Sequence, residues 1–101
     1  MLTSKQRSAL KSLAQNEDTI FQVGKGGINE NMTGQISDAL AARELIKVKV
    51  LDNSMLTAAE AAEEIAEATR SEVVQVIGSK FILYKRNNKD PKIVLPSKKK
   101  K

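Results

Sequence analysis

Apolar residues recur along this chain with a helical period in three stretches. They return every three or four residues over residues 4 to 15, 29 to 43 and 57 to 70, so each stretch is predicted to form a helix with one buried stripe. The predicted stripes are Ala9, Leu10, Leu13 and Ala14, then Ile28, Met32, Ile36 and Leu40, then Ala58, Ala61 or Ala62, Ile65 and Ala68. The helix starts are marked by two capping boxes and one N-cap: Thr3 with Gln6, Thr57 with Glu60, and Asn29.

Four shorter stretches between and after these helices have the composition of β-strands. They are TIFQV at 19–23, LIKVKVL at 45–51, VVQVI at 73–77 and FILY at 81–84. In LIKVKVL apolar residues alternate with lysines, so the two lysines are expected on one polar face. The continuous apolar VVQVI is typical of an interior strand, and FILY is predicted to be its hairpin partner. The predicted order is therefore αβαβαββ.

This order predicts one α/β domain with a four-stranded mixed sheet packed with three helices. A strand, helix, strand repeat normally forms a right-handed parallel crossover, and the final hairpin adds an antiparallel edge. A chain of 101 residues rarely divides into further domains. The domain is expected to span residues 1 to 95, followed by a basic flexible tail at residues 96 to 101.

Positive charge is concentrated towards the end of the chain. The formal net charge is +5, but residues 85 to 101 contain eight Lys or Arg and one Asp, so the other residues carry a net charge of −2. A basic balance favours a polyanionic partner such as nucleic acid. A lysine-rich terminus is also typical of a solubilising tail, so both explanations stay open.

The residue types present exclude most catalytic and metal-binding sites. Without Cys or His there is no disulfide, thiolate nucleophile, imidazole base or His-ligated metal. No apolar run is long enough to cross a bilayer, and the first residues lack the features of a signal peptide. We therefore expect a cytoplasmic protein without membrane contact. We also expect no catalytic activity, no cofactor and no small-molecule substrate, with an enzyme that acts on small phosphorylated substrates as a weaker alternative. The remaining carboxylates are expected on a solvated helix face rather than in a catalytic pair: Glu60, Glu63, Glu64 and Glu67.

A glycine-rich loop, Gly24 to Gly27, separates the first predicted strand from the second helix. It is not a Walker loop, because Lys25 is followed by Gly26 without a Ser or Thr, and a dinucleotide-binding fingerprint would need a third glycine at Asn29. What remains is a Gly-x-x-Gly loop. It is either an ordinary turn or a clamp in which main-chain N–H groups and Lys25 contact a phosphate, as KH domains hold nucleic-acid backbones.

The chain contains three motifs whose order and spacing resemble the CRM family, the chloroplast RNA splicing and ribosome maturation domain, and in particular its stand-alone bacterial YhbY-type members. The motifs are GKGGI, RELIKVKV and VVQVIGSKFILYK, and the resemblance covers residues 2 to 95. It implies a KH-like domain, similar to the C-terminal domain of a translation initiation factor, that binds RNA, associates with precursors of the large ribosomal subunit and has no catalytic activity. It also assigns the contact with the RNA backbone to Gly24, Lys25, Gly26 and Gly27.

Two positions depart from the family pattern without changing these expectations. Arg43 stands where the family often has His, and Lys85 stands where it often has Arg. Both residues keep or add positive charge, so the fold and RNA binding are expected to stand. A contact that needs a planar ring or a bidentate guanidinium at these positions is in doubt.

Three basic residues of the first helix are further candidates for RNA contacts. Lys5, Arg7 and Lys11 are expected on its outer face, where they contact RNA or only improve solubility. The chain has only three aromatic residues, Phe21, Phe81 and Tyr84, and their places in predicted strands favour core packing over base stacking.

Together, the residues and the resemblance to the CRM family imply a monomeric RNA-binding protein that acts on ribosomal RNA in precursors of the large subunit. A rival hypothesis from another class is a protein-interaction adaptor. In that case the acidic third helix docks on a ribosomal protein or assembly factor, and the tail supplies only loose electrostatic retention.

Overall fold

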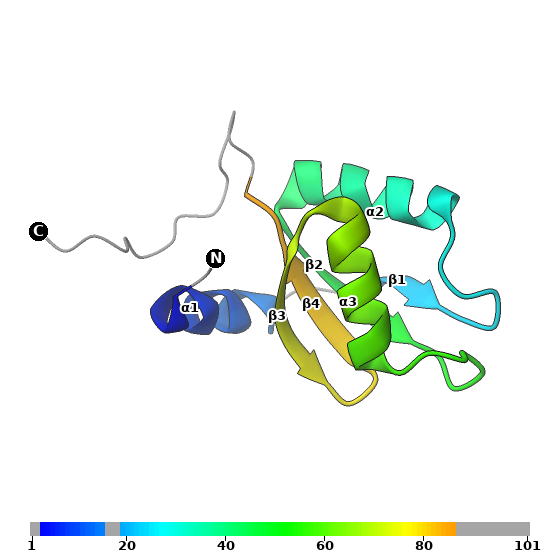
Figure 1. The fold of residues 1–101 in the computed structure, drawn as a ribbon. Coiled ribbons are helices and arrows are strands. Elements are labelled where there is room, and N and C mark those ends of the chain that lie inside the picture. Colours follow the sequence, from blue (N-terminus) through cyan, green and yellow to red (C-terminus); the bar gives the residue numbers. More distant parts are fainter. Residues whose placement is uncertain (1–2, 16–18, 87–101) are drawn as a thin grey trace, which may run out of the picture.

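The computed structural model describes residues 3–15 and 19–86, which form seven elements in the predicted order αβαβαββ. Figure 1 shows a sheet with helices on both faces. The predicted domain boundary at residue 95 and the tail at residues 96 to 101 lie outside the described residues. The elements are α1 (Ser4–Ala14), β1 (Thr19–Val23), α2 (Glu30–Arg43), β2 (Leu45–Val50), α3 (Ala58–Thr69), β3 (Glu72–Ile77) and β4 (Lys80–Tyr84).

The helices begin where the capping residues predict. Thr3 and Thr57 each accept a hydrogen bond from the backbone three residues on, and a Gln or Glu side chain at that position returns one. Asn29 caps α2 by accepting a hydrogen bond from the Met32 backbone at 2.8 Å. These caps satisfy N–H groups that the first turn of a helix leaves without partners, so they define the helix starts locally.

The sheet has the strand order β1-β2-β4-β3. β1 and β2 are parallel, and β4 runs antiparallel to both β2 and β3. This confirms the mixed sheet, but the expectation that VVQVI is an interior strand is wrong. It forms β3 at the edge of the described sheet, where Val76 is 40% and Ile77 55% exposed, whereas the residues of β4 from Phe81 to Tyr84 are buried. An apolar run does not determine which strand of a hairpin pairs with the rest of a sheet, because that pairing is a non-local contact.

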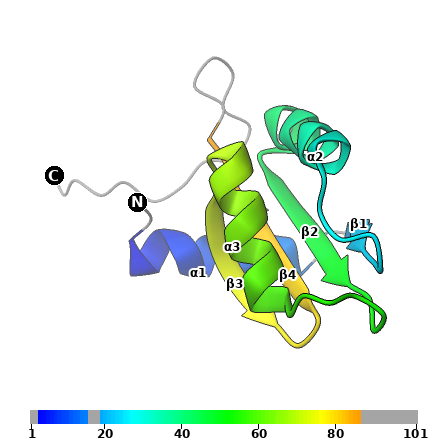
Figure 2. The same ribbon diagram turned by 45° about the vertical axis from the view of Figure 1, so that its right-hand side comes forward.

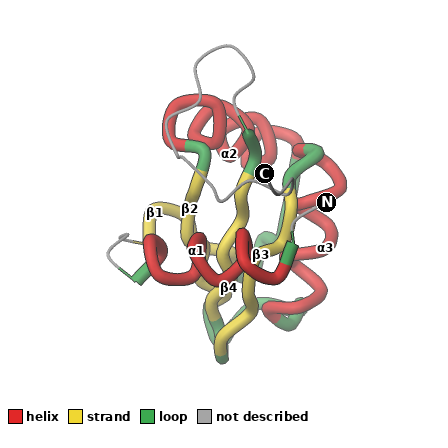
Figure 3. The backbone as a smooth tube through the Cα atoms, turned by 90° about the vertical axis from the view of Figure 1, so that its left-hand side faces the viewer, coloured by secondary structure: helices red, strands yellow, loops and turns green. Residues whose placement is uncertain are grey.

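Helices cover the two faces of the sheet unequally. α2 and α3 lie side by side on one face (Figure 2), and α1 crosses the strands on the other face (Figure 3). The α2 and α3 side contains the larger core, in which α3 packs against β3 and β4. Its fully buried members include Ile36, Leu40, Ile46, Val48, Ala61, Ala62, Ile65, Phe81 and Leu83.

The buried stripe of α3 differs from the predicted stripe at its C-terminal end. Ala68 was expected to face the core but is exposed, and Ala66 and Thr69 are buried instead. Thr69 can be buried because its hydroxyl donates a hydrogen bond to the Ile65 carbonyl at 2.8 Å. The four glutamates of α3 are exposed, as predicted: Glu60, Glu63, Glu64 and Glu67.

α1 packs through a smaller apolar cluster on the opposite face. Leu10 and Ala14 lie against residues of β2, β3 and β4, but Leu13, which the sequence places in the buried stripe, is 43% exposed. This contact is narrow, so α1 covers only part of this face of the four-stranded sheet. The sheet residues of this cluster are Leu45, Val74, Ile82 and Tyr84.

Tyr84 at the end of β4 lies within the electrostatic influence of the buried Glu44, which caps α2 with a positive φ of 66°. The Glu44 backbone N–H donates to the Leu40 carbonyl at 2.7 Å, and its carbonyl accepts from the Lys85 backbone at 2.9 Å. Burial raises the pKa of the Tyr84 phenol above its ordinary value of 10.0, and the Glu44 charge raises it further against a smaller opposing effect of Arg86. The folded protein therefore holds this proton more tightly than the unfolded chain.

A Tyr84→Phe variant should reveal this linkage as a change in alkaline stability. Because the phenol pKa is raised by folding, the stabilisation is present below about pH 10 and is lost as pH rises through the folded pKa. We expect the free energy of unfolding of the parent to fall more steeply above about pH 10 than that of Tyr84→Phe. Urea unfolding of both proteins at neutral and alkaline pH measures the difference, and identical pH profiles would contradict the prediction.

Candidate nucleic-acid interface

The glycine loop closes as a tight turn at the end of β1. The Gly27 N–H donates to the Gly24 carbonyl at 3.0 Å, and Gly27 has a φ of +73°, which explains the glycine at this position. Lys25 and Gly26 are exposed at the tip of the turn. A Cβ added to Gly26 would meet no atom within 4 Å, so the main chain here is open to a large ligand.

The turn does not lead directly into the helix that follows. Ile28 and Asn29 intervene, and the first turn of α2 contains Glu30 as well as the Asn29 cap. This cap and the Glu30 carboxylate already occupy much of the positive end of the helix dipole. The contribution of α2 to anion binding is therefore smaller than the sequence suggests, and Lys25 and the turn itself are the main candidates for contacting a phosphate.

Two other loops lie at the same end of the sheet as the glycine turn: the turn after β2 and the hairpin turn between β3 and β4. The Leu51 N–H donates to the Val23 carbonyl at 2.8 Å, and the Val50 N–H donates to the Ser79 carbonyl at 2.6 Å. A Cβ on Gly24 would lie 3.4 Å from Cδ1 of Leu51 and 3.6 Å from Oδ1 of Asn53. Parallel pairing of β1 and β2 brings the glycine turn beside the turn after β2, so neighbouring loops support it.

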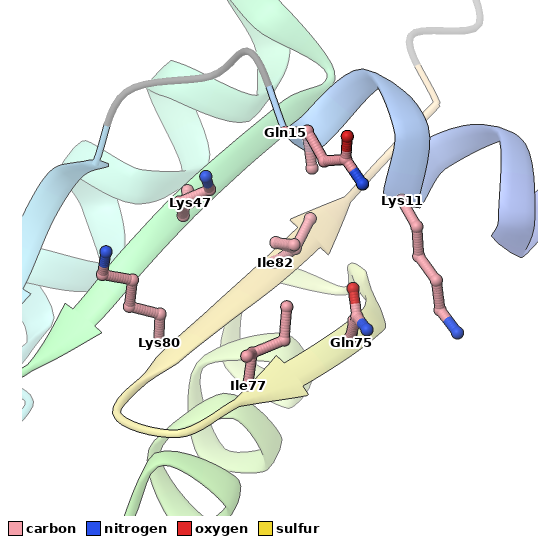
Figure 4. A pocket seen from close by; sticks show the side chains of 8 residues that line it. Lys11, Gln15, Lys47, Gln75, Ile77, Lys80 and Ile82 are labelled. Atoms are coloured by element: carbon pink, nitrogen blue, oxygen red, sulfur yellow. The ribbon is translucent and has the colours of Figure 1, made fainter.

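The three basic residues predicted on the outer face of α1 have different environments. Lys5 is exposed, and Lys11 is partly buried and extends away from α1 on the side where Gln75 of β3 lies (Figure 4). Arg7 does not lie on the outer face. Its Nη1 donates to the carbonyls of Val73 and Val74, the latter at 3.0 Å, where the register of β3 shifts. Its guanidinium therefore joins α1 to the sheet, and an RNA contact by Arg7 stays a prediction.

Three lysines of the sheet, Lys47, Lys49 and Lys80, are not among the RNA-contact residues that the sequence predicts. Lys47 and Lys49 lie on the α1 face of β2, and Lys80 is directly opposite Lys49 on β4. The alternation in LIKVKV indicates the first two. Lys80 joins them only through the pairing of β2 with β4, which no local sequence pattern indicates.

A groove with uncharged lining follows the outer edge of β1 next to the glycine turn. Its volume is about 610 Å³, and its amides come from β1 and from the start of α2. Side-chain amides both donate and accept hydrogen bonds, as the edges of nucleobases do. The polar side chains that line it are Thr19, Gln22, Asn29, Asn31 and Gln35.

The described residues offer neither a metal site nor a base-stacking platform. Among residues 3–15 and 19–86 there is no group of three Asp or Glu side chains that could hold a metal ion. Phe81 and Tyr84 are buried, and Phe21 is partly buried against the larger core, which confirms the predicted core packing of the aromatic residues. No helix within the described part of the chain is long and apolar enough to span a bilayer.

Comparison with known proteins identifies the family. The family model of the CRS1/YhbY (CRM) domain matches residues 2–85. The Bacillus subtilis protein YqeI, named a probable RNA-binding protein, is 49% identical over 95% of this chain and 100% of its own length. An RNA-binding protein of Haemophilus influenzae is 36% identical over 96% of this chain and 97% of its own length.

A solved structure agrees with this sequence relationship. The solution structure of a hypothetical Staphylococcus aureus protein, considered a candidate RNA-binding protein, matches with a TM-score of 0.79 and 57% identity. The match covers 95% of this chain and all of that one. The two proteins share the three helices and the four-stranded mixed sheet. By sequence and by fold, the chain belongs to the CRS1/YhbY (CRM) domain family.

Proposed function

We propose that this protein binds ribosomal RNA in precursors of the large ribosomal subunit and assists their assembly without catalysing a reaction. The observation that carries the proposal is the exposed glycine turn, which presents Lys25 and an unobstructed main chain at Gly26. Relatives over nearly the full chain are named as RNA-binding proteins, which supports RNA as the ligand. The role in assembly rests on the resemblance to the YhbY-type members.

The turn suits a contact with the RNA backbone rather than with a particular base. Gly26 leaves room for a sugar or phosphate to reach the main chain, and Lys25 adds a mobile positive charge beside it. The amide-lined groove begins two residues further on, at Asn29. Unpaired bases of a strand held at the turn lie within reach of its hydrogen-bonding groups, and the groove therefore favours RNA with a single-stranded segment.

The adaptor hypothesis has one structural observation in its favour. The outward face of α3 exposes four glutamates, which form an acidic surface on the side of the sheet opposite α1. Such a surface suits a basic protein partner. Binding to RNA through several phosphates weakens steeply as salt rises, whereas docking of a protein on α3 requires no RNA, so the salt dependence of RNA binding separates the two functions.

Deletion of the gene should disturb maturation of the large subunit more than translation by finished ribosomes. In extracts of the deletion strain we expect particles lighter than the mature large subunit to accumulate in sedimentation profiles. In extracts of the parent strain we expect the protein itself to sediment with large-subunit precursors. The proposal places it in the cytoplasm, as a monomer. A normal subunit profile of the deletion strain across growth temperatures, together with absence of the protein from precursor fractions of the parent strain, would exclude the assembly role.

A further inference from the structure

We propose that the α1 side of the sheet is a second RNA-contact surface, which binds the backbone of a double-helical RNA segment. This surface consists of Lys11, Lys47, Lys49 and Lys80 and is called the lysine face below. The inference rests on the proposed RNA-binding function and deepens it. It adds a site that lies outside the glycine turn and names the form of RNA that the site takes.

Strand register places the three sheet lysines on one face. Lys47 is directly opposite Ile82, and Lys49 is directly opposite Lys80, so each pair projects to the same side of the sheet. The alternate residues of β2, Ile46 and Val48, point into the larger core on the other side. The lysines therefore form two neighbouring rows on the face that α1 crosses.

α1 leaves this part of the face open. Its apolar contacts end at Leu10 and Ala14, and beyond them lies a groove of about 350 Å³ between the helix and the strands. Figure 4 shows Lys47 and Lys80 at one side of this groove, with Lys11 extending from α1 at the other. Ile77, 55% exposed, forms part of the groove surface between them. Lys11, Lys47 and Lys80 thus border a concave surface rather than standing singly on a convex one, and Lys49 lies opposite Lys80 beside it.

The charges in the two rows that hold the sheet lysines are unbalanced in a way that favours a polyanion, and the nearest strand carboxylate on this face, Glu72, lies opposite Tyr84 outside these rows. Each row crosses the sheet in the strand order β1, β2, β4, β3. One row consists of Thr19, Lys47, Ile82 and Gln75, and the next consists of Gln22, Lys49, Lys80 and Ile77. Neither row contains a carboxylate. Like charges directly opposite each other on antiparallel strands are destabilising, and this is the arrangement of Lys49 and Lys80. A bound phosphate backbone removes that repulsion, whereas solubility alone does not require the two lysines to be opposite each other.

The composition of the face favours a double helix over a single strand. Binding to single strands normally gains much of its affinity from bases stacked on aromatic side chains, and the lysine face has none. Helical RNA is instead recognised by its shape, its phosphates and its 2′-hydroxyls. Lysines supply mobile point charges for phosphates, and Gln75 in the groove offers an amide for a hydroxyl.

The lysine face and the glycine turn share one end of the sheet. Lys49 and Lys80 adjoin Val50 and Ser79, whose backbone hydrogen bond belongs to the cluster of loops beside the turn. A duplex on the lysine face can therefore continue into a strand held at the glycine turn. The preferred RNA is a helix that ends in a single-stranded extension, as at a junction or the base of a loop.

The test is a triple variant, Lys47→Gln, Lys49→Gln and Lys80→Gln, titrated with a short RNA duplex and with one of its strands at two salt concentrations. We expect duplex affinity at low salt to fall roughly tenfold or more, and the salt slope to become shallower by about 2 to 3 because three phosphate contacts are lost. The single strand should lose less. Thermal unfolding should show a melting temperature no lower than that of the parent, since the Lys49 and Lys80 repulsion is removed.

A matched control removes the same amount of charge elsewhere. Arg43 at the end of α2, Arg70 directly after α3 and Arg86 two residues after β4 are exposed, and their triple change to Gln should weaken duplex binding far less than the change on the lysine face. Equal losses in the two variants, or unchanged affinity and salt slope in the lysine variant, would overturn the inference. Equal loss for duplex and single strand would overturn the assignment to double-helical RNA.

Two further outcomes keep this inference separate from the proposed function. If the parent binds no RNA, the proposed function itself fails; if the parent binds and the lysine variant binds equally well, only the lysine face fails. Should circular dichroism show that the triple variant is unfolded, Lys80→Gln alone is tested, because Lys80 is exposed next to the hairpin turn. That change should reduce the salt slope for the duplex by about 0.9, and an unchanged slope counts against the proposal.

Discussion

Replacing Gly26 with Asp is expected to weaken RNA binding by roughly tenfold or more at low salt, without unfolding the protein. The structure makes this an informative substitution, because Gly26 lacks a positive φ and a Cβ there would meet no atom within 4 Å. The aspartate places a negative charge where a phosphate is expected to approach the main chain. Fluorescence titration with a labelled RNA at two salt concentrations measures the loss.

Two companion variants separate charge from shape at the glycine turn. Gly26→Asn adds a side chain of nearly the same size without charge and should bind RNA more tightly than Gly26→Asp. Lys25→Ala removes one exposed cation and should weaken binding about two- to fivefold without altering sequence preference, since a phosphate contact does not read bases. If all three variants fold by circular dichroism and bind RNA as the parent does at both salt concentrations, Gly24 to Gly27 form only a turn.

Replacing Arg7 with Ala is expected to lower the free energy of unfolding by about 2 to 3 kcal/mol. The guanidinium is partly buried and donates to two carbonyls of β3, so truncation removes charged hydrogen bonds and leaves the Val73 and Val74 carbonyls without this donor. It also removes the polar contact that complements the small apolar cluster under α1. Urea unfolding of the parent and the variant gives the difference.

Lys5→Ala is the matched control for the Arg7 variant. Lys5 is exposed two residues earlier in the same helix, and its truncation should change stability by less than about 0.5 kcal/mol. Equal stability of the two variants would mean that the Arg7 contact contributes nothing to holding α1 on the sheet. In that case Arg7 is available for RNA, and Arg7→Ala should reduce the favourable free energy of RNA binding by more than it lowers the free energy of unfolding.

The Arg7 contact and the lysine face are connected through α1. The helix is held by Leu10, Ala14 and Arg7 at one part of the sheet face, and its Lys11 borders the groove that α1 leaves open. Loss of the Arg7 contact should therefore also disturb the position of Lys11. RNA titrations of the Arg7 variant are best made well below its unfolding transition, where local docking of α1 rather than global unfolding is tested.

Most local features of the protein follow from its sequence alone. The three helices begin at the predicted caps because a cap is an interaction between residues three positions apart. Strand positions follow from short β-rich stretches, and a turn at Gly24 to Gly27 follows from its glycine content, whereas the positive φ of Gly27 is seen only in the structure. The absence of Cys and His excludes disulfides, thiolate nucleophiles and imidazole ligands by composition alone. Each of these properties depends on neighbouring residues or on composition.

The tertiary structure decided the features that depend on contacts between distant residues. It placed β4 between β2 and β3, although the apolar run of β3 had suggested the reverse, because β4 can bury both of its faces there. In the tertiary structure Arg7 donates hydrogen bonds to the carbonyls of Val73 and Val74, which are 66 and 67 residues away in the sequence, and Lys80 lies opposite Lys49. Periodicity determines which side of its own strand a residue occupies, but the partner strand, its register and the part of the face left open by α1 arise only when the whole core packs.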